Sequence, residues 1–198
     1  MKFEEIIKLM EKRRSIRQFK QTPISREIIE KCVNVARLAP SAKNLQPLEF
    51  LYIDDPQIVK DIFPNTRWAG YINPDGNPKE DCEPVSYLLN LVNLEICDNN
   101  FKYGLGAAVE NFIMSTLANG IGTCWLLSIN RKNIKNIVNL PEKYDLDSMI
   151  ALGYPNEDPI YEDTDEDIKY YKDENSGLHV PKRKMSKIYH HNKINSQD

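Results

Sequence analysis

Apolar side chains recur every three to four residues in three stretches of the chain, a pattern that predicts helices. The first stretch covers residues 3–10 and predicts a buried helix. The second covers residues 28–39, with Ser25 as a plausible N-cap and Pro40 as the stop. The third covers residues 103–119 and is apolar on almost every side, so it must be covered by other elements.

Shorter apolar runs without this spacing predict buried strands. Such runs occur at residues 49–53, 84–96, 125–129 and 149–152, and the second of them leads into the start of a helix. Short helices are expected at residues 57–63 and 131–138. Strands separated by helices indicate a sheet that is covered on both faces.

A single domain over residues 1–198 is expected, because a chain of this length can bury a substantial core. Residues 64–83 form a long connection rich in Pro, Asn, Gly and Asp, and such connections are usually functional or disordered. We expect this loop to lie near the site. Residues 156–180 are strongly acidic and predict an exposed loop, and residues 191–198 predict a frayed tail.

Composition narrows the classes of partner. The 26 Lys and Arg residues against 29 Asp and Glu give a net charge of -3, which argues against nucleic acid. The four cysteines lack the spacing of a zinc site or a disulfide framework, so reduced thiols and a cytoplasmic location are expected. The N-terminal residues do not resemble a signal peptide, and no apolar run approaches the length of a membrane span. No membrane partner is expected.

Candidate chemistry first appears directly after the first predicted helix, where Arg13, Arg14, Ser15 and Arg17 lie within five residues. Arg is well suited to phosphate because its planar fork donates two parallel hydrogen bonds and stays charged. Basic residues at the end of a helix are also common without a ligand, because the helix dipole favours them there. Both explanations fit this segment when it is taken alone.

A second polar segment lies between Pro40 and Pro47 and contains Ser41, Asn44 and Gln46. These neutral side chains could contact a ligand, although such residues usually cap turns.

Together, Arg13-Arg14-Ser15-Ile16-Arg17-Gln18-Phe19 and the segment from Pro40 to Pro47 resemble two motifs of the nitroreductase family of flavin-dependent oxidoreductases. Leu48 departs from the second motif, which usually has Trp at this position. Further segments resemble the family in the same order along the chain: Asp98 with residues 104–111, then residues 120–125, 151–155 and 181–184.

The resemblance implies an α+β fold, a three-layer α/β/α sandwich around a central, mostly antiparallel sheet, in an intertwined homodimer. It also implies tightly bound, non-covalent FMN, with NAD(P)H as a transient electron donor. A nitroaromatic, a quinone or a similar small molecule would be the acceptor. Such ping-pong hydride transfer through flavin N5 needs no catalytic side chain, because the cofactor supplies the chemistry.

The same resemblance assigns the phosphate end of FMN to two basic segments. Arg13 and Ser15 would hold the phosphate and the adjoining ribityl oxygens, and Arg183 would approach the phosphate from the C-terminal segment. Arg14 and Lys182 would be neighbours of this phosphate.

The flavin ring is assigned to two further segments. Arg17 matches the family's cation near flavin N1 and the C2 carbonyl, where a positive charge favours the anionic reduced flavin. The backbone at Leu126, Leu127 and Ser128 would lie beside the ring. The family commonly has Gly where this chain has Leu127, a departure that bears on substrate access.

The resemblance also implies that the partner subunit contributes to each site. The residues expected to reach the flavin in this way are Pro40, Ser41, Ala42, Asn44 and Gln46.

Some alternatives stay open at the level of sequence. Residues 68–71 of the long loop either face the substrate or pin the loop to the core through Trp68 and Tyr71. The function could also be another flavin reaction on the same fold, such as reductive dehalogenation or flavin fragmentation. A third possibility is an FMN-binding or storage protein without catalysis.

Overall fold

The computed structural model describes residues 2–97 and 99–194, and it contains one main antiparallel sheet flanked by helices. The strands of this sheet are β1 (Phe19–Lys20), β2 (Leu48–Ile53), β3 (Ser86–Asn93), β4 (Gly122–Leu126) and β5 (Tyr144–Pro155). The α-helices are α1 (Phe3–Lys12), α2 (Arg26–Ala36), α3 (Pro56–Ile62), α4 (Lys102–Ala118) and α5 (Arg131–Ile137). Short 3-10 helices are η1 (Ala42–Asn44), η2 (Phe63–Asn65), η3 (Gly70–Ile72) and η4 (Met185–Lys187). The strand order is β1-β5-β3-β2, and β4 also pairs with β5.

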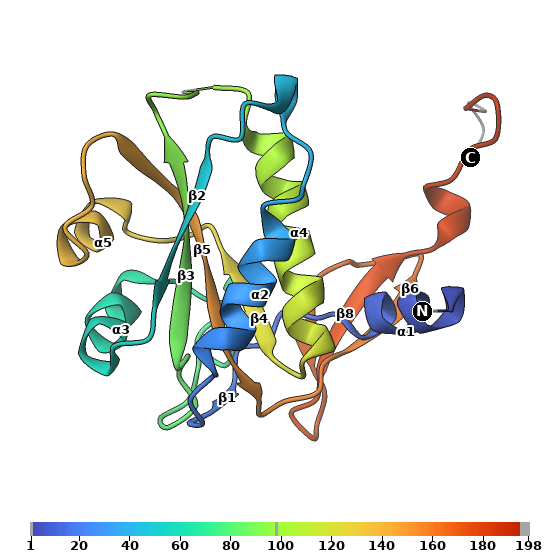
Figure 1. Cartoon of the computed structure of the whole chain (residues 1–198). Coiled ribbons are helices and arrows are strands. Elements are labelled where there is room, and N and C mark those ends of the chain that lie inside the picture. The colour runs from blue at the N-terminus through green and yellow to red at the C-terminus, as the bar shows by residue number, and fades with distance from the viewer. Residues whose placement is uncertain (1, 98, 195–198) are drawn as a thin grey trace.

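Alternating side chains on the strands build a core on each face of the sheet. Leu88 on β3 packs with residues of α2 and α4, whereas its neighbours Tyr87 and Leu89 pack with residues of α3 and α5. Figure 1 shows the same division, with α2 and α4 on one side of the sheet and α3 and α5 on the other. The expected three-layer α/β/α arrangement with an antiparallel central sheet is confirmed.

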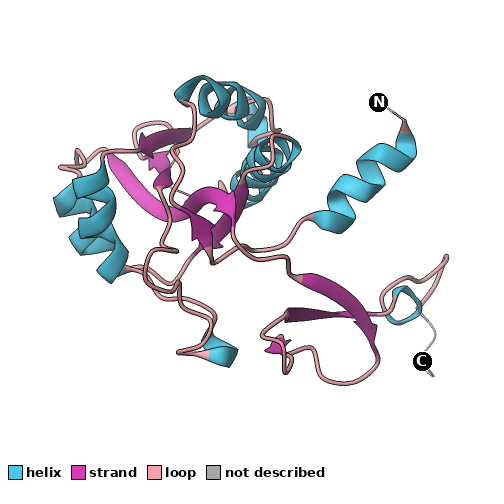
Figure 2. Cartoon of the chain, turned by 90° about the horizontal axis from the view of Figure 1, so that it is seen from below, coloured by secondary structure: helices cyan, strands magenta, loops and turns pink. Residues whose placement is uncertain are grey.

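Residues 156–180 are not the exposed loop that the sequence predicts, because they contain two of the three strands of a second sheet and the start of the third. This sheet consists of β6 (Ile160–Thr164), β7 (Tyr171–Lys172) and β8 (Leu178–Arg183), in the order β6-β8-β7. Figure 2 shows it projecting from the main body on the same side as α1. Its strands carry mostly polar residues, so hydrophobic periodicity cannot detect them.

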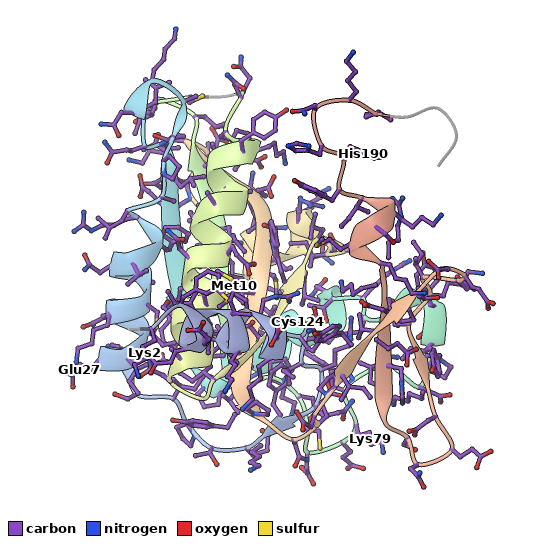
Figure 3. All side chains as sticks on the ribbon, turned by 90° about the vertical axis from the view of Figure 1, so that its right-hand side faces the viewer. Lys2, Met10, Glu27, Lys79, Cys124 and His190 are labelled. Atoms are coloured by element: carbon purple, nitrogen blue, oxygen red, sulfur yellow. The ribbon has the colours of Figure 1, made fainter. Side chains whose placement is uncertain are left out.

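The expectation that the first helix is buried is wrong for this chain. No residue of α1 is buried, and Phe3 and Met10 are 71% and 52% exposed. The helix contacts α4 but stands away from the main sheet, as Figure 2 shows, and Figure 3 places Met10 on this outlying helix. The apolar stripe predicts the helix correctly, but a stripe alone does not say which surface covers it.

Several element boundaries also differ from the sequence predictions. α2 ends at Ala36, four residues before Pro40, and β4 lies three residues earlier than expected. A turn, and not a helix, follows β3 at residues 94–96. β5 is much longer than its predicted apolar run because it begins in a stretch that contains Asp145, Asp147 and Ser148 and continues through Gly153 to Pro155. Asp98 and residues 195–198 of the expected tail lie outside the described residues.

We searched residues 2–97 and 99–194 for a helix with the length and apolar character of a membrane span, and found none.

Candidate functional site

The long loop and the end of β4 enclose a cavity of about 590 Å³. The cavity is lined by Arg17, Thr66, Arg67, Trp68, Ala69, Gly70, Asn73, Asn77, Cys124, Trp125, Leu126, Leu127 and Ser128. It therefore brings Arg17 together with residues 126–128, as the sequence predicts, although more than a hundred positions separate them. Residues of the loop at 64–83 also line this cavity.

Backbone hydrogen bonds fasten the loop to the segment that follows β4. The Arg67 N–H donates to the Ser128 carbonyl at 3.0 Å, and the Asn130 N–H donates to the Asn65 carbonyl at 2.8 Å. Between them, Thr66 and Ile129 form an antiparallel bridge. This pairing fixes the loop backbone at one wall of the cavity.

Trp68 satisfies both interpretations that the sequence leaves open. It is 6% exposed and packs in the core, and its indole N–H donates to the Thr66 hydroxyl at 2.8 Å. It also lines the cavity. Tyr71 is 60% exposed and does not line the cavity, so only part of the segment from Trp68 to Tyr71 faces it.

Arg17 is held at the cavity by contacts at both its backbone and its side chain. Its backbone N–H donates to the Glu157 carboxylate, and its guanidinium carbon lies 5.3 Å from the centre of the Tyr170 ring. The Nε atom of Arg17 is buried and has no hydrogen-bond partner among the described residues. A buried donor without an acceptor is costly, so this atom indicates an acceptor supplied by a ligand.

A second group of cations lies at the N-terminal end of the Arg segment. Partial burial, and then the charge of Arg13, lowers the pKa of Arg14. Partial burial also lowers the pKa of Lys182, with further contributions from Arg13 and Arg14. Arg13 has an ion pair with Glu110 at 3.6 Å. Because the positive charges of Arg13, Arg14 and Lys182 lie close together here, an anion bound among them would be stabilised.

Ser15 lies in the segment that joins the cationic group of Arg13, Arg14 and Lys182 to the cavity that Arg17 lines. It forms a parallel bridge with Thr123 on β4, and the next residue, Ile16, donates its N–H to the Thr123 carbonyl at 2.8 Å. Burial raises the pKa of the neighbouring Cys124 thiol, with smaller opposing effects from Arg17 and Ser15. Residues 13–17 therefore run beside β4 from the cationic group to the cavity.

The structure separates the two predicted residues of the C-terminal segment. Lys182 lies with Arg13 and Arg14, whereas Arg183 donates from Nη2 to the Lys187 carbonyl at 2.9 Å. Lys182 therefore lies within the cationic group, and a contact of Arg183 with the phosphate stays a prediction.

Residues 40–46 do not lie at the Arg17 cavity of the same chain. Ser41 lines two smaller cavities beside the start of α4, one shared with Ala42 and the other with Pro40 and Gln46. Asn44 and Gln46 have positive φ angles of 56° and 53°, and the Ser41 hydroxyl accepts the Gln46 N–H at 3.0 Å. This exposed, tightly turned loop presents its polar groups away from the Arg17 cavity.

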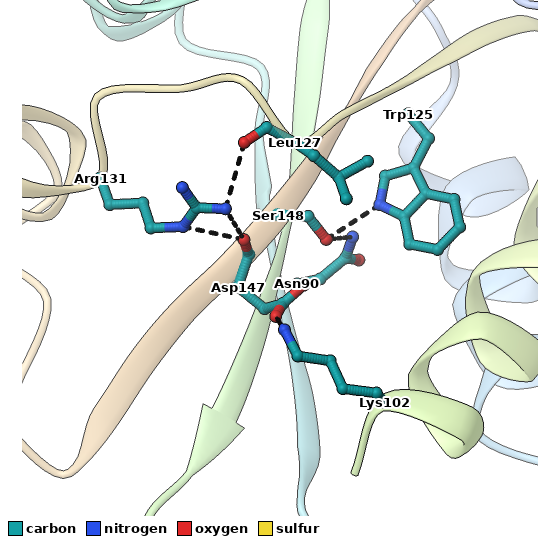
Figure 4. Close-up of polar contacts among 7 residues, drawn as sticks. All are labelled: Asn90, Lys102, Trp125, Leu127, Arg131, Asp147 and Ser148. Atoms are coloured by element: carbon teal, nitrogen blue, oxygen red, sulfur yellow. Dashed lines mark hydrogen bonds and ion pairs between the residues drawn. The ribbon is translucent and has the colours of Figure 1, made fainter.

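Sequence reasoning missed Arg131, whose guanidinium bonds to backbone carbonyls at the cavity wall (Figure 4). Its Nη2 donates to the Leu127 carbonyl at 3.1 Å, and its Nε donates to the Asp147 carbonyl at 3.0 Å. The Asp147 carboxylate in turn pairs with Lys102 at the start of α4. A basic residue after the N-cap Asn130 gives no signal of this role in the sequence.

Figure 4 also shows how Trp125 is held. Its indole N–H donates to the Ser148 hydroxyl at 2.9 Å, and the Asn90 amide donates to the same oxygen at 3.1 Å. These bonds fix Trp125, another residue that lines the cavity, against β5.

A larger cavity, of about 1010 Å³, lies between α3 and residues 83–85. It contains none of the predicted site residues, and Asp54, Asp61 and Glu83 outnumber the single cation Lys60 in its lining. The charges of the smaller cavity suit an electron-rich, anionic ligand better, so we place the site there.

The chain is similar to several known proteins in sequence and in fold. The sequence profile described as "Nitroreductase family" matches residues 10–79 and 100–154, which include Arg17 and residues 126–128. A provisionally named NADH dehydrogenase/NAD(P)H nitroreductase of Archaeoglobus fulgidus is 30% identical over 82% of this chain and 92% of its own length. An iodotyrosine deiodinase of Thermotoga neapolitana is 24% identical over 75% of this chain and 88% of its own length.

The fold has a solved counterpart as well. A provisionally named nitroreductase from Desulfovibrio desulfuricans, solved in complex with FMN, superposes with a TM-score of 0.70. The match covers 96% of this chain and 98% of that one, at 20% identity.

Proposed function

The chain belongs to the nitroreductase family, and from this premise we propose that it is an FMN-dependent oxidoreductase. NAD(P)H would be the electron donor, and a nitroaromatic, quinone or similar small molecule the acceptor. The observation that carries the proposal is the buried Nε of Arg17, which has no hydrogen-bond partner in the described part of the chain. Arg17 lines a cavity next to the backbone of residues 126–128.

The chain's own residues fit the two ends of FMN. The neighbouring cations Arg13, Arg14 and Lys182 offer charge-assisted donors to a phosphate, with Ser15 adjacent. Arg183 would join them by releasing the Lys187 carbonyl. FMN, when bound, supplies the hydride and electron chemistry that the side chains lack.

At the ring end, Arg17 would stabilise negative charge, and the backbone of Leu126, Leu127 and Ser128 would offer donors and acceptors at the ring edge. Leu127 is 57% exposed, so its side chain limits which substrates can approach this wall of the cavity.

We further propose a homodimer in which each site is completed by the partner chain. The polar loop with Pro40, Ser41, Ala42, Asn44 and Gln46 lies away from the Arg17 cavity of its own chain, so it is free to serve the cavity of a second copy. The exposed apolar stripe of α1 supports the same proposal, because exposed apolar surface of this kind marks an interaction site.

The proposed compartment is the cytoplasm. Cys32, Cys82, Cys97 and Cys124 are all free thiols, and thiols persist in a reducing environment.

A second candidate function is a different flavin reaction on the same fold, in particular reductive dehalogenation. The deiodinase of Thermotoga neapolitana favours it, since that relative shares most of this chain at 24% identity. Product analysis with a nitroaromatic and with a halogenated phenol separates the two reactions. Binding of FMN without reduction by either nicotinamide would instead select a storage protein.

The cofactor proposal can be tested through intrinsic fluorescence. The chain has two tryptophans, Trp68 and Trp125, and both line the cavity. Titration of the apoprotein with FMN should therefore quench this fluorescence with saturation. Absence of quenching, together with a protein that retains no FMN through gel filtration, would contradict the proposal.

The variant Arg13→Ala tests the phosphate end in the same titration. A lost charge-assisted contact costs about 1.5 to 3 kcal/mol, so FMN affinity should fall by roughly one to two orders of magnitude. Glu110→Gln is the matched control, because it removes the partner of Arg13 and keeps the cation. Unchanged affinity in Arg13→Ala would remove this residue from the site.

A further inference from the structure

The Arg17 cavity contains a second guanidinium, Arg67, that the cofactor proposal does not use. The backbone of Arg67 is fixed by its hydrogen bond to the Ser128 carbonyl at 3.0 Å and by the neighbouring bridge between Thr66 and Ile129. The next residue, Trp68, is buried. Arg67 itself is exposed and lines the cavity, so its side chain extends from a fixed backbone at the place where the cavity opens to solvent.

The side chain of Arg67 is uncommitted. Among residues 2–97 and 99–194 it has neither an ion pair nor a side-chain hydrogen bond, whereas other arginines of the chain have such partners, as Arg26 does with Asp54. The amides of Asn73 and Asn77, which also line the cavity, bond to each other at 3.2 Å. Arg67 is thus the group at the mouth of the cavity with donors free for a ligand.

The side chains that line the cavity give it a net positive charge. Arg17 and Arg67 line it, and its lining includes no Asp or Glu within the described residues, although the whole chain has a net charge of -3. Apolar walls at Trp68, Trp125 and Leu126 concentrate the field of these two cations. Because the Nε atom of Arg17 is buried and this residue is assigned to the flavin, the exposed cation Arg67 is left for the second ligand.

We propose that Arg67 is a specificity-determining residue that selects acceptors carrying an anionic group, such as a carboxylate on an aromatic ring. The inference rests on the proposed function and adds the substrate class to it. The guanidinium would pair with the carboxylate at the cavity mouth while the reducible group of the acceptor lies deeper, near Arg17 and residues 126–128. Arg67 takes no part in the electron transfer.

The test compares 4-nitrobenzoate with 4-nitrobenzamide, which have nearly the same shape and differ in charge. In the FMN-loaded wild-type protein, kcat/KM should be higher for the benzoate, and added salt should reduce the difference because the pair is exposed. Arg67→Gln should lower the benzoate-to-benzamide ratio by up to about fivefold, the range for an exposed ion pair. Arg67→Lys should keep most of the preference, because it keeps the charge.

Arg26→Gln is the matched control, since it removes an exposed arginine that does not line this cavity. It should leave the ratio unchanged. A wild-type ratio near one, or a ratio that Arg67→Gln does not change, would overturn the inference.

A binding measurement gives a second readout that does not depend on turnover. Benzoate and benzamide should both quench Trp68 and Trp125, and the wild-type protein should bind benzoate more tightly, a preference lost in Arg67→Gln. If the protein reduces both acceptors equally and binds both probes equally, only the inference fails. If neither nicotinamide reduces the flavin, the proposed function fails, and the binding preference then decides whether Arg67 is an anion-binding residue.

Discussion

Among single residues, Arg17 is the most important for the proposed function. The sequence indicates that a cation is present, but only the structure shows that Nε is buried without a partner and that the guanidinium lies over Tyr170. Such a group is held in place before a ligand arrives, and preorganised charge is worth more in a site of low dielectric constant.

Arg17→Gln should therefore make the reduced flavin less stable. If the lost charge costs a factor of ten in the equilibrium, the two-electron potential becomes more negative by roughly 30 mV. A spectroelectrochemical titration of wild-type protein and variant measures this shift. An unchanged potential in a variant that still binds FMN would show that Arg17 does not act on the redox edge of the ring.

The residues that sequence reasoning missed share one physical property. Arg67 and Arg131 both contact residues that are distant in the sequence. The Arg67 backbone N–H donates to the Ser128 carbonyl, and the Arg131 guanidinium donates to the Asp147 carbonyl. No local motif encodes such a contact, whereas Arg13 and Arg17 lie in a compact segment that can be recognised. Arg183 was placed with the phosphate by resemblance, yet its Nη2 bonds to the Lys187 carbonyl in this chain.

At the scale of elements, the wall beside the cavity depends on how α5 is joined to β4 and β5. Arg131 links the helix to both strands through the carbonyls of Leu127 and Asp147 (Figure 4). The position of the peptide between Leu127 and Ser128 is therefore set by a helix that does not itself line the cavity.

Arg131→Met should loosen this wall. Removal of the donors should lower the free energy of unfolding by about 1 to 2 kcal/mol, as expected for partly buried carbonyls that lose a charged donor. Urea unfolding measures the loss, and hydrogen exchange of the Arg67 amide, which donates to the Ser128 carbonyl, should accelerate. Lys132→Met, on the next residue of the same helix, is the control. Equal behaviour of the two variants would show that Arg131 does not hold the wall.

The small sheet depends on a histidine between two carboxylates. The Nδ1 atom of His179 on β8 lies 3.1 Å from Oε2 of Glu162 on β6. Its Nε2 atom lies 3.2 Å from Oδ2 of Asp173, which follows β7. The His179 ring stacks on the ring of Tyr171. Hydrogen bonds to Glu162 and Asp173 raise the pKa of His179, with smaller contributions from their charges.

Because the folded pKa is raised, the stabilisation from His179 is complete below the ordinary histidine pKa of 6.5 and is lost as the pH rises through the higher folded value. The β6-β8-β7 sheet should therefore open more readily at alkaline than at mildly acidic pH. Hydrogen exchange of β8 amides, corrected for intrinsic rates, measures this change. His179→Gln should abolish the dependence; a dependence that persists in the variant would assign it to another group.

At the scale of the whole molecule, two projecting parts lack a covering surface in one chain. α1 exposes Phe3 and Met10, and the C-terminal segment exposes Met185, Ile188 and Tyr189. In Figure 3 this segment, with His190, stands away from the main body. Periodicity predicts the layers around the main sheet well because their faces are buried within the chain, but it misplaces α1, whose Phe3 and Met10 stay exposed in the single chain.

A double variant, Phe3→Asp with Met10→Asp, should weaken the proposed dimer, because each charge would have to be buried at the interface. Light scattering should then report a mass close to 23 kDa for a single chain, whereas the wild-type protein should give twice that value. Affinity for FMN should fall in parallel, since each site would lose the partner's polar loop. Lys8→Asp is a control on the same helix. A wild-type protein that scatters as a monomer would contradict the shared site.

The central claim is that this chain passes electrons from a nicotinamide to a small molecule through FMN. The most direct measurement is the visible spectrum of the FMN-loaded protein under anaerobic conditions, recorded before and after NADH or NADPH and then after 4-nitrobenzoate. The band of oxidised flavin should bleach with at least one nicotinamide and return with the nitroaromatic. A band that neither nicotinamide bleaches, in a protein that has bound FMN, would contradict it.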